Sequence, residues 1–453
     1  MRSGGWLTIS ACPGKACPCE GEGGHRFSDK DMRHFKKAEE RNMQIDLCGA
    51  LVAVAVLAAA PPACADVITD WNENAVTLVT PRMPPPVAQR AVAMVQVAMF
   101  DAVNSIERRY RPYLVQLEAA SIASKEAAAA AAAGAVLAGV IPNAEKQAQE
   151  LTASYLAALP EGEAKSEGVK LGKAVAARIL QARRNDGSDA PDAYRPKTKP
   201  GVYVPTAITV GSTWPNVTPF ALKSPAQFRP EPPIALAGKE WAADYKQIKD
   251  LGAKNSTKRS ARQTEDARFW LITGPQSTDP IARQLVAAKK LNVLDSARFM
   301  ALASVALADA YIAVMDAKYH YEFWRPITAI RNGDIDGNPA TDRDPTWQPI
   351  DNTPMHPEYP CAHCIGSSAL ATVVETVLET AEIPEIVMTS PTAPGVTHRW
   401  TNIRGYTDEV SQARIWAGFH YRFSTLVGQE MGQKIGRYVV ANVMQPAAVA
   451  QAR

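Results

Sequence analysis

The sequence has little net charge and, beyond its first residues, almost no cysteine. Its 453 residues carry 49 Lys and Arg against 46 Asp and Glu, a formal charge of +3. This balance excludes a basic surface built on net charge, so no nucleic-acid partner is expected. Five of the seven cysteines lie at or before Cys64, which excludes a disulfide-built fold for the rest of the chain. The hydrophobic content of 46% is ordinary for a globular protein.

An uncharged apolar run over residues 47–60 has the layout of an export signal. Basic residues precede it, and an Ala-Cys-Ala cleavage pattern that ends at Ala65 follows it. The run is too short to favour a membrane-spanning helix. We therefore expect an exported protein, periplasmic or secreted, that begins near Asp66 and has no stable membrane span. A buried helix is the less favoured reading.

The residues before Met32 fit no signal peptide, which indicates that residues 1–65 combine an early, mis-called start with the signal. Cys12, Cys17 and Cys19 lie in this stretch. A small zinc knuckle is the alternative, but no second ligand pair follows at a matching spacing.

Helical periodicity dominates the rest of the chain, whereas strand patterns are few and short. We expect an all-α fold of the helical-bundle type with long ordered loops. The predicted helices cover residues 87–106, 119–140, 163–184, a stretch from about 238, 295–321, 363–381 and 407–442, the last with a break near its glycines. Pro-rich loops are predicted over 185–233 and 332–359.

We divide the chain into an N-terminal helical half over 66–300, a catalytic helical half over 301–445 and a tail over 446–453. Three short segments in or near the second half concentrate cations and histidines beside apolar helices.

The first segment, Lys318-Tyr-His-Tyr-Glu-Phe-Trp-Arg325-Pro326, closes the long apolar helix. Lys318 and Arg325 are seven residues apart, so on a helix they would lie two turns apart on one face. Both could bind one anion, Arg325 through the N–H groups of its planar guanidinium and Lys318 through the positive charge of its ammonium. Taken alone, a solvated basic helix end is the simpler explanation.

The second segment, His356-Pro-Glu-Tyr-Pro-Cys-Ala-His363-Cys364, runs from a proline-led turn into a helix that starts near His363. Free N–H groups at such a start can bind an anion, and a histidine there can exchange a proton. Cys361 and Cys364 also form a C-x-x-C pair. A redox pair or a zinc site with His356 and His363 is possible, although no βαβ pattern surrounds the pair and the zinc spacing is irregular.

The third segment contains Arg414 and His420, six residues apart, with Gly418 between them. Six residues do not share one face of a straight helix, but a break at Gly418 would let both side chains converge. Either residue singly could be structural.

In this order, Lys-x6-Arg-Pro, Pro-x-x-His and Arg-x5-His resemble the vanadium-dependent haloperoxidases and the related type 2 phosphatidic acid phosphatase superfamily. The local sequences at 322–326 and 418–423 are similar to the haloperoxidase branch. The resemblance covers about residues 68–443 and implies the helical-bundle fold of that superfamily.

The resemblance implies roles for matching positions. Lys318, Arg325 and Arg414 would bind the oxygens of vanadate, or of phosphate in a phosphatase. His363 would be the acid–base residue, and His420 would be the vanadium ligand or the phosphatase nucleophile.

Four further positions are read from the same resemblance. Cys361 stands where the family usually has Ser, and Ala362, whose N–H would bind an oxygen, stands where it usually has Gly. Ser424 replaces an Asp that often steadies the axial histidine, so His420 would be less basic. His356 in the halide pocket favours bromide or iodide over chloride.

The favoured interpretation is a vanadate-dependent haloperoxidase that uses peroxide to oxidise halide, with Lys318 also polarising the peroxide. The alternative is a periplasmic acid phosphatase that cleaves phosphate esters through a phosphohistidine on the same residues. A thiol- or metal-binding helical protein centred on Cys361 and Cys364 is a minor alternative. The partners would be small molecules, and a homodimer is possible.

Overall fold

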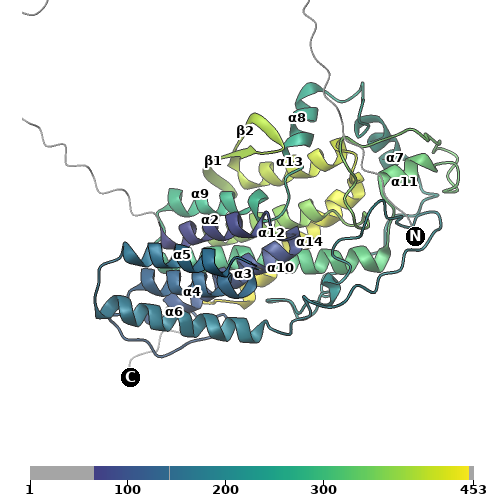
Figure 1. Ribbon diagram of the computed structural model, residues 1–453. Coiled ribbons are helices and arrows are strands. Elements are labelled where there is room, and N and C mark those ends of the chain that lie inside the picture. The colour runs from purple at the N-terminus through teal and green to yellow at the C-terminus, as the bar shows by residue number, and fades with distance from the viewer. Residues whose placement is uncertain (1–65, 142, 448–453) are drawn as a thin grey trace, which may run out of the picture. The chain divides into compact units, whose positions relative to one another are not determined.

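The long helix α10 runs through the middle of the fold and packs against α3, α12 and α14 (Figure 1). The computed structural model describes residues 66–141 and 143–447. The predicted early start and export signal lie outside these residues. The helices are α2 (Val67–Val79), α3 (Pro85–Glu107), α4 (Lys125–Val140), α5 (Glu145–Ala157), α6 (Glu163–Ala182), α7 (Lys239–Leu251), α8 (Ala261–Phe269), α9 (Asp279–Lys289), α10 (Val293–Tyr321), α11 (Pro326–Arg331), α12 (Ala362–Leu378), α13 (Ile403–Trp416) and α14 (Arg422–Asn442).

The chain is mostly helical, as predicted, and the ends of the predicted helices are close to the observed ones. The Ala-rich helix is shorter than predicted, because α4 begins only after Ser124, whose hydroxyl caps the helix by accepting from Ala127 N–H. The break predicted near the glycines of the last helix is the turn at Gly418, between α13 and α14.

An antiparallel hairpin of β1 (Glu382–Ser390) and β2 (Ala393–Asn402) departs from the helical pattern. Its register pairs Ile386 with Trp400 and Met388 with His398. The hairpin was not predicted, because its apolar residues are too few to stand out from neighbouring helical patterns.

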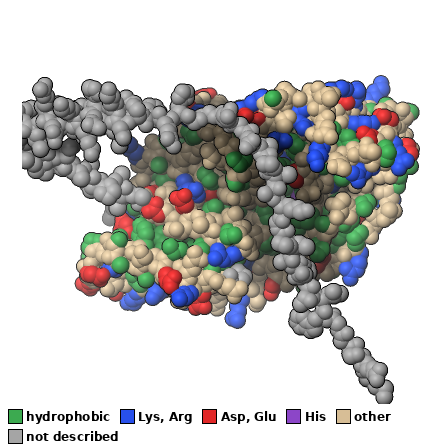
Figure 2. All heavy atoms as spheres, turned by 45° about the horizontal axis from the view of Figure 1, so that its top comes forward, with side chains coloured by type: hydrophobic (Ala, Val, Ile, Leu, Met, Phe, Trp, Pro, Cys, Tyr) green, Lys and Arg blue, Asp and Glu red, His purple; other side chains and the backbone are tan. Residues whose placement is uncertain are grey.

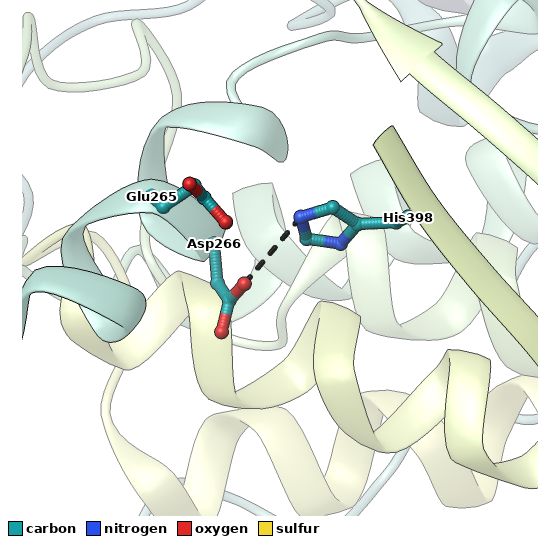
Figure 3. Close-up of side chains that lie close together, drawn as sticks. All are labelled: Glu265, Asp266 and His398. Carbon is teal, nitrogen blue, oxygen red and sulfur yellow. Dashed lines mark ion pairs between the residues drawn. The ribbon is translucent and has the colours of Figure 1, made fainter. Parts of the chain in front are cut away.

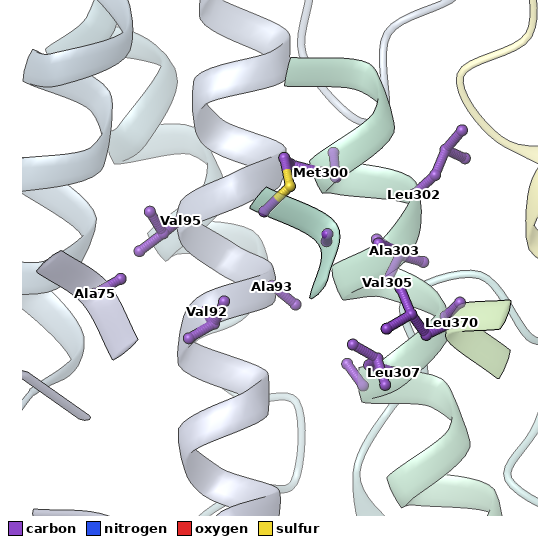
Figure 4. Close-up of a cluster of buried hydrophobic side chains, with 14 of the residues drawn as sticks. Ala75, Val92, Ala93, Val95, Met300, Leu302, Ala303, Val305, Leu307 and Leu370 are labelled. Atoms are coloured by element: carbon purple, nitrogen blue, oxygen red, sulfur yellow. The ribbon is translucent and has the colours of Figure 1, made fainter. Parts of the chain in front are cut away.

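Helix α10 is apolar on all sides because neighbouring helices surround it. The Asn292 side chain caps its start by accepting from Asp295 N–H, and Glu322 ends it in the left-handed conformation with φ 50°. Within the described residues, α10 has the length and composition of a membrane span, but its most apolar window is wholly buried inside the protein. Figure 4 shows side chains of α10 such as Met300, Val305 and Leu307 in the core shared with Val92 and Val95 of α3.

Two buried carboxylates fix loops onto the core. Asp309 on α10 accepts from the backbone N–H groups of Phe220, Ala221 and Leu222 at 2.6–2.8 Å, which holds the long loop over 185–233 against the helix. Asp101 on α3 does the same for three successive N–H groups over 113–115. Burial raises the pKa of each carboxyl to about 6, although the N–H donors oppose the shift. The loop is therefore ordered, as predicted.

The predicted boundary between the two halves, at residue 300, falls inside α10. The predicted second half contains the C-terminal end of α10 and α11 to α14, and α12 packs most extensively against α14. Gly432 allows this close approach, since a Cβ there would lie 2.3 Å from Ile365 O. The division into halves stays a prediction. On the face shown in Figure 2, basic and acidic side chains are interspersed, in keeping with the small net charge.

Candidate oxyanion site

Lys318 lies in the last turn of α10, and its side chain is fully buried. Its ammonium donates to Pro357 O at 3.0 Å and to Glu358 O at 2.7 Å. An ammonium has three donors, so one remains for a ligand. Burial, followed by the nearby charge of Arg325, holds the pKa of Lys318 well below its ordinary value.

Arg325 does not share a helical face with Lys318, so that prediction was wrong. Helix α10 ends at Tyr321, the chain turns at Glu322, and Arg325 is the N-cap of the next short helix. Pro326 at the first position of α11 explains this, because a residue before proline is forced out of the helical conformation. Arg325 is nevertheless buried beside Lys318, and its guanidinium donates to His356 O and Phe419 O at 2.8 and 3.0 Å.

Ala362 and His363 are the first two residues of α12. The first N–H groups of a helix have no intrahelical partner, so the N–H of Ala362 is suited to an anion. His363 Nε2 lies 2.9 Å from Ile272 O. A carbonyl only accepts, so Nε2 carries the proton and Nδ1 is the nitrogen that can exchange one.

Cys361 forms a disulfide with Cys364 across the N-terminus of α12. Its sulfur also accepts from Cys364 N–H as the helix cap. The expected oxygen contact through the Cys361 thiol is therefore wrong for this structure, because a disulfide sulfur has no proton to donate. The zinc site proposed for the two thiolates is excluded for the same reason.

Gly418 brings Arg414 and His420 together. It ends α13 with φ +78°, after which Phe419 and His420 donate their backbone N–H groups back to Arg414 O at 3.1 and 3.3 Å. A side chain at Gly418 would be strained by this φ, and a Cβ would lie 2.5 Å from Gly252 O. The predicted convergence at this break is thus explained by the left-handed turn.

Glu358 is a site residue that the sequence interpretation missed. It is fully buried, and its Oε1 lies 2.7 Å from His420 Nδ1 and accepts from Tyr421 N–H at 3.1 Å. Burial raises the pKa of Glu358 to about 7, against the lowering effect of Lys318 and Arg325. The carboxylate expected to be lacking at Ser424 is therefore supplied by Glu358. The acidic residue two positions after His356 was the available signal.

Glu358 also fixes the tautomer of His420. An ionised carboxylate only accepts, so Nδ1 carries the proton and Nε2 offers a lone pair. His420 Nε2 lies 3.4 Å from Arg325 Nη1. Burial and then the charges of Arg325, Lys318 and Arg414 hold the pKa of His420 well below its ordinary value, so the ring is neutral.

The pocket gathers more positive than negative charge. Burial lowers the pKa of Arg325 to about 10 and that of Arg414 to about 9. Burial, followed by the charge of Arg414, holds the pKa of His363 well below its ordinary value. Glu358 is the carboxylate that raises the pKa of Lys318 and of Arg325 against the effect of burial. The Nε of Arg414 is buried without a hydrogen-bond partner. Three buried cations with an unpaired donor fit a multiply charged oxyanion, which would offset their repulsion and accept the donor.

A cleft of about 1200 Å³ reaches Arg414, His356 and Phe419 from the surface. His356 is one of the residues that line it, and its Nδ1 is 2.9 Å from Arg325 Nη2. Burial, followed by the charges of Lys318 and Arg325, lowers the pKa of His356 well below its ordinary value. A neutral imidazole therefore lines the approach to the cations.

A second group of polar residues, Glu265, Asp266 and His398, brings possible metal ligands close together (Figure 3). Arg262 already pairs with this group. It lies 2.7 Å from Glu265, 2.9 Å from Asp266 and 3.5 Å from His398. The arginine supplies the cation that these acceptors require, so the group is an ion-pair network.

The fold and the pocket together define a helical-bundle protein in which three cations and two histidines are gathered in the interior. Residues 298–448 match the family model described as the VCPO second helical-bundle domain. The vanadium chloroperoxidase of Curvularia inaequalis is 30% identical over 188 residues, which cover 34% of this chain. The match spans only 30% of that relative's length.

Solved structures of the same kind share the fold over most of the chain. The structure of the first bacterial vanadium-dependent iodoperoxidase superposes with a TM-score of 0.73 at 24% sequence identity. The match covers 84% of this chain and 98% of the iodoperoxidase chain. A holo-type bacterial vanadium-dependent chloroperoxidase has a TM-score of 0.65 at 18% identity and covers 81% and 94%. These comparisons show that the chain shares the helical-bundle fold of the solved vanadium haloperoxidases and that residues 298–448 match a domain model of that kind, in agreement with the resemblance of the sequence motifs.

Proposed function

We propose that this protein is a vanadate-dependent haloperoxidase-like enzyme that uses peroxide to oxidise halide. The observation that carries the proposal is the burial of Lys318, Arg325 and Arg414 around two neutral histidines. The names of the similar proteins, which are vanadium iodo- and chloroperoxidases, support vanadate over phosphate as the anion.

The proposed roles follow from the contacts. Lys318, Arg325 and Arg414 would hold the anion's oxygens together with the N–H of Ala362. When bound, vanadate supplies the Lewis acidity that activates peroxide towards halide. His420 would offer Nε2 to the vanadium, because Glu358 holds the proton on Nδ1.

His363 and Lys318 would serve the proton and charge movements. Ile272 O fixes the His363 ring so that Nδ1 can take up or release a proton in the pocket. The third donor of Lys318 would polarise an oxygen of the bound peroxide. His356, which lines the cleft, supports bromide or iodide as the halide, and the cleft would give these small molecules access.

The test is halogenation of an organic acceptor by purified protein with vanadate, peroxide and bromide or iodide. His420→Ala should lower the rate about 100-fold or more, as expected for losing a side chain that acts at the reacting centre. His320→Ala is the matched control, since His320 is an exposed histidine at the end of α10, and its rate should stay within about twofold of the wild type. Lack of vanadate-dependent turnover would overturn the proposal. Hydrolysis of a phosphomonoester that vanadate inhibits would instead support the acid phosphatase.

We also propose export, with cleavage near Ala65. The basic residues, apolar run and small-residue exit before this position support it. Amino-terminal sequencing of the protein from the periplasm or medium should read from near Asp66. An uncleaved protein found only in the cytoplasm would contradict the proposal.

A further inference from the structure

The segment over 270–272, directly after α8, supplies two carbonyl groups to the pocket residues. Trp270 O accepts from Arg414 Nη1, and Ile272 O lies 2.9 Å from His363 Nε2. The position of this short segment therefore sets the direction of one cation and one histidine of the oxyanion site.

Glu409 holds the same segment from the other side. Its Oε1 accepts from the indole N–H of Trp270 at 2.9 Å and lies 2.5 Å from His398 Nδ1, and its Oε2 accepts from the indole N–H of Trp400 at 3.0 Å. Burial raises the pKa of Glu409, but the bonds from His398 and the indoles outweigh it and hold the pKa below its ordinary value. Glu409 is thus an ionised acceptor for three donors.

Glu409 and Arg414 belong to one helix, α13. Arg414 donates to the backbone carbonyl of Trp270, and Glu409 accepts from its indole N–H, so α13 makes two hydrogen bonds to this residue. These two bonds fix the position of Trp270 relative to α13, the helix that carries Arg414.

The β1–β2 hairpin completes the support. The ring of His398 stacks on Phe269 with centroids 3.9 Å apart and planes at 11°. Ser390 Oγ donates to Phe269 O at 2.8 Å. The last turn of α8 is therefore held by the hairpin immediately before the 270–272 segment begins.

We propose that Glu409 is a positioning residue for the oxyanion site, acting through Trp270 on Arg414 and His363. The inference rests on the proposed function only in that the pocket binds an oxyanion. Charge-assisted hydrogen bonds to a carboxylate are strong and directional, so losing the one from Trp270 would loosen the two carbonyl contacts.

Two substitutions separate positioning from general stability. Trp270→Phe and Trp400→Phe each remove one indole N–H from Glu409 and keep a buried ring, since these tryptophans are 1% and 6% exposed. Only Trp270 carries the carbonyl that binds Arg414. We expect Trp270→Phe to raise the dissociation constant for vanadate about tenfold, which corresponds to about 1.4 kcal/mol, while Trp400→Phe leaves it within about twofold.

The measurement is calorimetric titration of each purified protein with vanadate and, in parallel, with inorganic phosphate, alongside melting temperatures. Glu409→Gln removes the charge but keeps one acceptor oxygen, so it should weaken vanadate binding by no more than Trp270→Phe does. The double variant should bind no more weakly than Trp270→Phe alone, because both changes act on one interaction. Should Trp270→Phe fail to fold, Glu409→Gln gives the same comparison with Trp400→Phe.

The outcomes distinguish the two proposals. Unchanged vanadate binding in Trp270→Phe, or equal weakening in Trp400→Phe, overturns the role of Glu409 and leaves the proposed function intact. Wild-type protein that binds phosphate but shows no halogenation overturns the haloperoxidase, while the binding comparison still decides the role of Glu409. Wild-type protein that binds neither anion overturns both.

Discussion

Replacing Gly418 by Ala tests whether the turn between α13 and α14 builds the site. Gly418 has φ +78°, a conformation that costs a residue with a Cβ about 1–2 kcal/mol. The new Cβ would lie 2.5 Å from Gly252 O and 3.0 Å from atoms of Trp347 and Pro349. Overpacking of this kind costs about 1–3 kcal/mol. We therefore expect the free energy of unfolding to fall by about 2–5 kcal/mol.

The same substitution should damage catalysis. Phe419, next in the chain, gives its carbonyl to Arg325, and His420 follows directly. Relieving the contact with Gly252 O requires this backbone to move, and a displacement near 1 Å in a catalytic group can cost about 100-fold in rate. Vanadate-dependent halogenation should fall on that scale.

The assay is urea unfolding together with halogenation rates for wild type, Gly418→Ala and Gly405→Ala. Gly405 is the matched control, since it lies exposed in α13 with no atom within 4 Å of the added Cβ. Ala there should raise stability by up to about 1 kcal/mol without changing the rate. Wild-type stability and activity in Gly418→Ala would refute the reasoning that this turn needs glycine.

Three further predictions follow from other buried groups. The pKa of Asp309 is raised from 3.8 to about 6, so the protonated side chain stabilises the fold below pH 4 and this contribution is lost as the pH rises through 6. In urea titrations, the free energy of unfolding of the wild type relative to Asp309→Asn should therefore fall by about 3 kcal/mol over this range. Replacing Cys361 and Cys364 by Ser, or reducing the wild type, should lower stability by about 2 kcal/mol, the chain-entropy value for so short a loop; equal urea midpoints with and without reductant would contradict this. Glu358→Gln should lower halogenation about 10–100-fold without weakening phosphate binding. It should also abolish the rise in rate through pH 7 that ionisation of Glu358 gives the wild type, and an unchanged pH profile would contradict its role towards His420.

The helical class and most of the site residues could be predicted from sequence because their signals are local. The apolar run of α10 needs no partner to be recognised, and its observed bounds differ little from the predicted ones. Lys318, Arg325, His363, Arg414 and His420 were proposed as site residues from the order of their motifs rather than from spacing on a helix, and the structure brings them close together. The helical face assigned to Lys318 and Arg325 was wrong because Pro326 ends that pattern.

Contacts between distant segments could not be predicted. Glu358 meets His420 across 62 positions, and Trp270 O meets Arg414 across 144. Neither contact produces a periodic pattern in the sequence, since each depends on how the helices pack. The hairpin that supports α8 was missed for the same reason.

The sequence by itself determined which residues carry charge and imidazole, and that most of the chain is helical, because residue chemistry and hydrophobic period are properties of short stretches. The tertiary structure decided that Glu358 orients His420, that Cys361 has no thiol to donate, and that carbonyls after α8 direct Arg414 and His363. These depend on which atoms burial brings together, and that is fixed only when the helices pack around α10.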